Sequence, residues 1–191
     1  MTEIVLEKKR LLWNQPGVPH INWVCLDMED VEDDYEKCEM CGNYPIRYVH
    51  LMEHQDYFSS LRVGCICAGK MEGSSKQAKK REKQFKQELM IRSLRQLWKQ
   101  SSSNQRPLIE QYVKYFQNQN PPGFSPNQLI FLITQLKYQQ IRFDPSWFSL
   151  RIRKAFEKEQ LFRMPSWKIQ RLWSCLTSSQ KQLIQNNIKL K

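Results

Sequence analysis

The spacing of apolar and polar residues divides the chain into a front part that favours strands and a rear part that favours helices. Short runs rich in β-branched and aromatic residues predict strands at residues 21–26, 45–50 and 61–63. The polar segment 55–60 lies between the last two runs, and we expect it to form the turn of a β-hairpin.

A single long helix is predicted at residues 74–99, with Ser74 or Ser75 as its cap. The first half of this segment offers only Ala78 and Phe85 as apolar contacts, so it cannot be buried on all sides. The second half adds apolar residues that can anchor it to a core: Leu89, Met90, Leu94, Leu97 and Trp98. We therefore expect the helix to project a basic face while its far end packs.

The rear part carries clear helix-start signals after a polar linker at residues 100–107. One helix is expected around residues 108–116. Another should follow Ser125, because Pro126 and Gln128 supply a first-turn proline and a capping-box partner. Further helices are expected to begin at Asp144-Pro145, at Pro165-Ser166 and at the capping sequence Thr177 to Gln180. The helix from Asp144 would carry Phe148, Ile152, Ala155 and Phe156 on one face.

The charge of the chain is large and unevenly distributed. The 191 residues carry a formal net charge of +11, yet residues 1–64 hold 6 Lys+Arg against 12 Asp+Glu, whereas residues 65–191 hold 24 against 7. Such an excess of positive charge is typical of a protein that binds a polyanion, and nucleic acid is the expected partner. Seven of the ten residues 27–36 are acidic, and we expect a solvated loop or helix face there. The alternative is that this run repels phosphate or docks on a basic surface of the protein itself.

The six cysteines are too few for a small secreted disulfide scaffold. The first residues lack the basic-then-apolar order of a signal peptide, and no apolar run approaches the ~20 residues that span a bilayer. We therefore expect a cytoplasmic protein with reduced thiols and no membrane partner. Cys25 and Cys175 lie in apolar settings and are expected to be core residues.

The remaining cysteines have the spacing of metal ligands. Cys38-x2-Cys41 is followed, after the predicted hairpin, by Cys65-x-Cys67, so two pairs of thiolates can complete a tetrahedron around a structural Zn²⁺ ion. His54 is the first substitute for one of these ligands, and His50 is the second. A redox dithiol fits less well, because its C-x-x-C would start a helix after a strand.

Together these features predict an α+β protein with a small treble-clef-like zinc module, made of a knuckle, a β-hairpin and the long basic helix, followed by an all-α helical module. The predicted boundaries are residues 1–99 for the zinc module, 100–107 for the linker and 108–191 for the helical module.

Two catalytic interpretations also match these residues. The sequence His50-Leu51-Met52-Glu53-His54 has the H-x-x-E-H pattern of zinc peptidases, but that chemistry needs both histidines on one helix face. A ββα-metal nuclease would use His50 as its general base, yet the long helix lacks the His, Asn or Asp expected to hold its cation. We assign no catalytic residue.

The cysteine region resembles a recurrent small zinc-binding motif of uncharacterised bacterial and phage proteins. The residues that carry the resemblance are Cys38-x2-Cys41-Gly42, Ile46-Arg47-Tyr48-Val49-His50, His54 and Val63-Gly64-Cys65-x-Cys67-Ala68-x2-Met71. The resemblance covers roughly residues 20–99. It implies a treble-clef-like zinc site and a bacterial, phage or mobile-element setting, and it brings no activity with it.

The favoured function is therefore non-catalytic binding of DNA or RNA, with zinc holding the front module while basic side chains contact phosphates. The candidate contacts are Lys70, Lys76, Lys79, Lys80, Arg81, Lys83, Lys86, Arg92 and Arg95, with Arg142, Arg151, Arg153, Lys154, Lys168 and Arg171 in the helical module. The alternative is an adaptor subunit that docks on a larger protein or ribonucleoprotein through Trp147, Phe148, Trp167 and Trp173.

Overall fold

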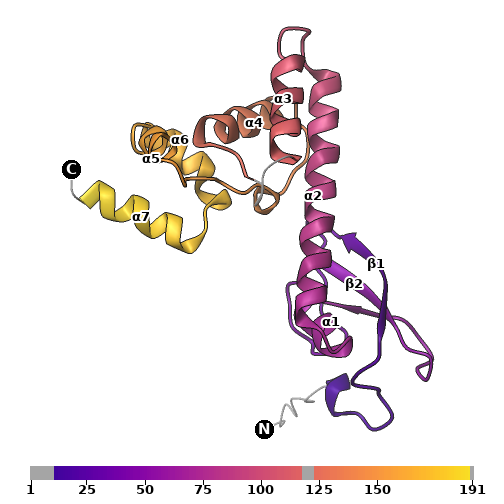
Figure 1. Cartoon of the computed structure of the whole chain (residues 1–191). Helices are drawn as coiled ribbons and strands as arrows, with labels where there is room; N and C mark the ends of the chain where they lie inside the picture. Colours follow the sequence, from indigo (N-terminus) through magenta and orange to yellow (C-terminus); the bar gives the residue numbers. More distant parts are fainter. Residues whose placement is uncertain (1–10, 118–122, 190–191) are drawn as a thin grey trace, which may run out of the picture. The chain divides into compact units, whose positions relative to one another are not determined.

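The computed structural model of the protein describes residues 11–117 and 123–189, and its contacts divide the chain into two units, Met1–Phe85 and Lys86–Lys191. The first unit combines an antiparallel sheet with helices, and helices dominate the second, so the predicted α+β class is confirmed (Figure 1).

The sheet of the first unit has the strand order β1-β2-β3, with β1 at Val24–Asp30, β2 at Tyr48–Glu53 and β3 at Leu61–Val63. Both pairings are antiparallel, and His50 in the central strand lies opposite Met28 on one side and Val63 on the other. The register of β1 shifts between Cys25 and Asp27. The predicted hairpin is thus present, and it places His50 in the middle of the sheet.

Strand β1 starts and ends later than the predicted strand at residues 21–26, and it includes the first acidic residues of the run 27–36. Asn22 has a φ of 65°, which is incompatible with a strand at that point. Three carboxylates of the run form ion pairs with arginines of the first unit: Asp30 pairs with Arg47 at 2.7 Å, and Glu29 and Glu36 pair with Arg62 at 2.8 and 2.7 Å. These ion pairs let an acidic segment lie on a strand edge.

Two helices follow β3 where the sequence suggests one. Helix α1 spans Cys65–Met71, and helix α2 spans Ser75–Gln100. Gly73, with a φ of 74°, turns the chain between them, and the Ser74 hydroxyl accepts a hydrogen bond from the Gln77 amide at 3.3 Å. Helix α1 packs against β2, and the core there includes Met52, Val63, Met71 and Ala78.

The boundary between the two units falls inside α2 rather than in the segment 100–107. Met90, Leu94 and Leu97, in the second half of α2, have no exposed surface, and the Ser93 hydroxyl donates a hydrogen bond to the Arg142 carbonyl at 3.1 Å. The predicted anchoring of the far end of this helix is therefore confirmed.

The second unit contains α3 (Arg106–Gln117), α4 (Pro126–Tyr138), α5 (Ala155–Phe162), α6 (Ser166–Leu172) and α7 (Ser178–Lys189), with short 3-10 turns η2 (Pro145–Trp147) and η3 (Trp173–Cys175). The capping box of Ser125 and Gln128 starts α4 as predicted. Thr177 and Gln180 exchange the equivalent bonds at the start of α7. Phe124, stacked on Phe116 with ring centroids 5.0 Å apart, lies in the core of this unit.

The prediction that a helix starts at Asp144 is wrong. Only η2 forms a helical turn, with the Asp144 carboxylate accepting from the Ser146 amide at 2.7 Å, and residues 148–153 then run without helical structure. The main chain of this segment forms hydrogen bonds with residues that are distant in sequence. Phe124 exchanges hydrogen bonds with Ser149 and Arg151, and the Gln180 side chain donates to the Leu150 carbonyl. Helix formation would break these bonds.

In the part of the chain that the structure describes, no helix combines the length and the apolar character needed to cross a membrane.

Candidate metal centre

Cys38 and Cys41 lie in a tight turn before β2. The Gly42 amide donates to the Cys38 carbonyl at 2.6 Å, and the Cys38 amide donates to the Asn43 carbonyl at 2.9 Å. Gly42 has a φ of 71°, a left-handed conformation that glycine adopts without a steric penalty. This turn brings the two thiols to one side of the chain.

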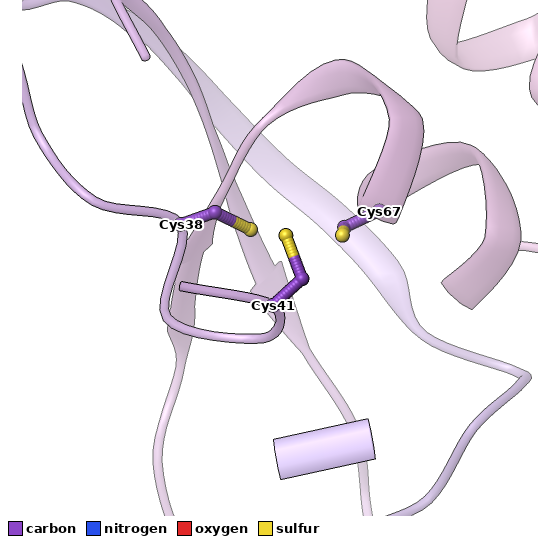
Figure 2. A group of neighbouring side chains, drawn as sticks. All are labelled: Cys38, Cys41 and Cys67. Carbon is purple, nitrogen blue, oxygen red and sulfur yellow. The ribbon is translucent and has the colours of Figure 1, made fainter. Parts of the chain in front are cut away.

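A third thiol comes from α1. Helix α1 begins two residues after β3, so Cys67 lies in its first turn. The sulfur atoms of Cys38, Cys41 and Cys67 all lie within 4.8 Å of one another, and Figure 2 shows them gathered between the turn and the helix. Cys38 and Cys67 are buried and Cys41 is partly buried. The sequence predicts that all four thiols lie together. The structure brings three of them together.

The local hydrogen bonds prepare one of these thiols to lose its proton. The hydrogen bond from the Cys67 thiol, helped by the amides of Gly64 and Cys41, lowers the pKa of Cys38 below its usual range although burial opposes this. The same hydrogen bond, together with burial, raises the pKa of Cys67. A metal ion can replace the shared proton, because thiolates are the ligands that zinc prefers. The donor set therefore fits the predicted ion.

Cys65 takes a different position. Its sulfur groups with His50 from β2 and Glu82 from α2, and one potential ligand atom of each lies within 4.8 Å of the others. Cys65, Glu82 and the three knuckle thiols all line a cavity of about 390 Å³. The two groups thus adjoin one space.

His54, the first predicted substitute ligand, belongs to neither group among the residues described. Its Nδ1 accepts a hydrogen bond from the Asp56 amide at 3.0 Å, and its ring packs on Trp23 with centroids 5.4 Å apart. His50 and Glu53 lie in β2, so the H-x-x-E-H pattern does not occupy a helix here. The geometry required by zinc peptidases is missing from this segment.

Glu82 was not recognised as a candidate in the sequence. It follows Ala78 by four residues, and side chains at this spacing share one helix face. Ala78 is fully buried in the core of the first unit. An acidic residue on the same helix face was therefore the sequence signal that could have identified Glu82 as a candidate ligand.

The candidate nucleic-acid contacts are distributed over both units. In the first unit Lys76, Lys79, Lys80 and Lys83 are exposed on α2. Lys70 is also exposed, with its ammonium group 5.9 Å from the centre of the Trp13 ring. Arg81 instead pairs with the largely buried Glu72 at 2.6 Å.

In the second unit most of the candidates remain accessible. Lys86 is partly buried, whereas Arg92, Arg95, Arg142, Arg153 and Lys154 are exposed. Lys168 and Arg171 contact the exposed Trp167 ring at 5.4 and 5.0 Å. Arg151 pairs with the buried Glu157 at 2.6 Å.

Comparison with known protein families, curated proteins and solved structures finds no match to this chain.

Proposed function

We propose that this protein binds DNA or RNA through a basic face of its first unit, whose fold is held by a zinc ion. The observation that carries the proposal is a set of four exposed lysines on the first turns of α2. Lys76, Lys79, Lys80 and Lys83 are spaced i, i+3, i+4 and i+7, which places them on one face of the helix. Clustered cations of this kind attract phosphates, and the net charge of +11 adds long-range attraction.

Two ion pairs remove residues from the predicted set of nucleic-acid contacts. Arg81 and Arg151 each neutralise a carboxylate with little or no exposed surface, since the Glu72 and Glu157 side chains are 6% and 0% exposed. Removing either arginine from its partner would leave a buried charge unpaired. We therefore leave both out of the proposed binding surface.

The metal ion has a structural role in this proposal. Cys38 and Cys41 from the turn and Cys67 from α1 would bind zinc, joining a knuckle, a hairpin and a helix in a treble-clef-like arrangement. Because the ligands come from segments far apart in sequence, zinc binding contributes directly to the folding of the first unit. An accessory role in a bacterial, phage or mobile-element system and a cytoplasmic location stay predictions of the sequence.

The binding proposal is tested by neutralising the lysine face. The variant Lys76→Gln/Lys79→Gln/Lys80→Gln/Lys83→Gln is compared with the control Lys99→Gln/Lys114→Gln/Lys137→Gln/Lys158→Gln, which removes the same charge from exposed lysines of the second unit. The readout is binding to duplex DNA, single-stranded DNA and RNA of equal length over a range of salt concentrations.

We expect the first variant to weaken binding to at least one of these polymers and to reduce the salt slope of log K by about 3 units, at roughly 0.7–0.9 per lost phosphate contact. The control should retain most of the slope. Equal losses in the two variants, or binding that does not depend on salt, would refute the lysine face as the binding surface.

The adaptor alternative receives less support from the aromatic residues. Trp147 and Phe148 are buried inside the second unit, whereas Trp167 is exposed and Trp173 is partly exposed. Two of the four predicted docking residues are therefore part of the hydrophobic core of the second unit.

A further inference from the structure

A second group of potential metal ligands lies beside the cysteine knuckle. His50 comes from the central strand β2, Cys65 from the start of α1 and Glu82 from the second turn of α2. The nitrogen, sulfur and oxygen atoms that these side chains offer lie within 4.8 Å of one another. All three residues belong to the first unit.

The Cys25 thiol lies beside one ring nitrogen of His50. The Cys25 thiol donates to the Asp27 carbonyl at 3.3 Å, so its single hydrogen is used there. Its sulfur also lies 3.8 Å from His50 Nδ1, and it can act only as an acceptor in that contact. In a neutral His50 ring this contact favours the tautomer with its proton on Nδ1, in which Nε2 presents a lone pair.

That lone pair is buried without a hydrogen-bond partner. His50 has no exposed surface, and its Nε2 makes no hydrogen bond to any described residue. Its near neighbour is the Glu82 carboxylate, with Oε2 at 3.5 Å. Two electron-rich atoms facing each other, one on the fully buried His50 and one on the partly buried Glu82, are unfavourable unless a proton or a metal ion lies between them.

The spacing suits a shared metal ion. Ligand atoms bonded to a tetrahedral zinc at about 2.0–2.3 Å lie roughly 3.3–3.8 Å apart, and the distance from His50 Nε2 to Glu82 Oε2 is within this range. An imidazole nitrogen, a thiolate and a carboxylate are all ligands of zinc. The contact between Cys25 and Nδ1 is the kind of outer contact that orients a ligating histidine.

We propose that His50, Cys65 and Glu82 bind a second zinc ion, distinct from the one held by Cys38, Cys41 and Cys67. Three protein ligands leave one tetrahedral position at this ion for water or another ligand, as the three thiols do at the other ion. Cys65 and Glu82 line the cavity of about 390 Å³, as do Arg47 and Lys70. Arg47 is paired with Asp30, so of these two lining cations it is Lys70 that would favour an anionic ligand at the open position.

The proposal changes the expected stoichiometry. A four-cysteine site would bind one ion per chain and would use Cys65, whereas the arrangement proposed here binds two ions and assigns Cys65 to the second. Metal content is therefore a direct test that does not depend on nucleic-acid binding.

The test uses the full chain purified in the presence of zinc, with elemental analysis and competition against a chromophoric chelator. Glu82→Gln preserves shape and removes the ligand charge, and Glu88→Gln is the control on an exposed position of the same helix. The second pair is His50→Gln with the exposed His20→Gln as its control. Circular dichroism verifies that each variant is folded.

We expect about two zinc ions in the wild type and in both controls, and about one in folded Glu82→Gln, which should lose one of the two chelator-competition phases. Cys38→Ser should release both ions, because it unfolds the first unit, which also carries His50, Cys65 and Glu82. One ion in the wild type that survives Glu82→Gln but is lost in Cys65→Ser would overturn the proposal and support a four-cysteine site. Two ions in Glu82→Gln would also overturn it. A wild type without zinc would contradict both this proposal and the structural zinc ion.

Discussion

The Arg151 guanidinium and the Glu157 carboxylate form an ion pair with a shortest distance of 2.6 Å, in which Glu157 has no exposed surface. The other carboxylate oxygen accepts hydrogen bonds from the amides of Arg153 and Lys154 at 2.8 and 3.0 Å. The pair thus joins the extended segment before α5 to the first turn of that helix, and it gives Arg151 a structural role.

Replacing Arg151 should destabilise the second unit strongly. Arg151→Met leaves the Glu157 carboxylate buried without its cation, and we expect the free energy of unfolding to fall by about 3 kcal/mol. The control is Arg163→Met, which breaks an exposed ion pair with Glu159 and should change stability by less than about 0.5 kcal/mol. Urea unfolding measures both, and similar losses in the two variants would contradict a dominant role for the buried pair.

The same carboxylate should make stability depend on pH. Burial alone would raise the pKa of Glu157, but the Lys154 amide, the Arg151 guanidinium and the Arg153 amide together lower it. A carboxyl whose pKa is lowered in the folded state contributes stability above its unfolded pKa of about 4.3, and this stability is lost as the pH falls through the folded-state value.

We therefore expect the difference in unfolding free energy between wild type and Glu157→Gln to be constant from about pH 7 to 5 and to shrink below about pH 4. Urea titrations monitored by tryptophan fluorescence at each pH measure this difference. A difference that stays unchanged down to pH 3 would show that Glu157 does not contribute through its charge.

Loss of a knuckle thiol should release zinc and unfold the first unit. Cys38→Ser removes the thiol whose pKa the local hydrogen bonds lower, and we expect the sheet amides of β1 and β2 to lose protection against hydrogen exchange. Cys175→Ser is the control, because Cys175 is buried in the second unit, outside both ligand groups found among the described residues. Elemental analysis should show the wild-type zinc content in Cys175→Ser, and loss of metal in both variants would argue against the knuckle.

The close approach of α1 and α2 should make Gly69 intolerant of a side chain. A Cβ atom at Gly69 would lie 2.7 Å from Ser75 Cα, so Gly69→Ala forces the two helices apart at a cost of about 1–3 kcal/mol. Gly73→Asn is the control, since asparagine tolerates the left-handed conformation and the structure leaves room for its Cβ. Thermal unfolding compares the two, and a wild-type midpoint for Gly69→Ala would show that the contact relaxes freely.

Much of the local structure was predictable because its signals act within one turn of the chain. The capping residues Ser125 and Gln128 satisfy each other's main-chain groups, and Thr177 and Gln180 do the same. The helix at Asp144 failed as a prediction because the groups that compete with it come from Phe124 and Gln180, which are distant in sequence. A local pattern carries no information about such partners.

By itself, the sequence determined the α+β class, the hairpin, most helix starts and a knuckle able to hold metal, because these depend on residue type and short-range spacing. Only the tertiary structure decided that Cys67 joins Cys38 and Cys41 while Cys65 lies with His50 and Glu82. These groupings depend on how β2, α1 and α2 pack, and side chains meet there from positions up to 32 residues apart, as His50 and Glu82 do. The grouping of potential metal ligands in the first unit is therefore set by packing that no local pattern encodes.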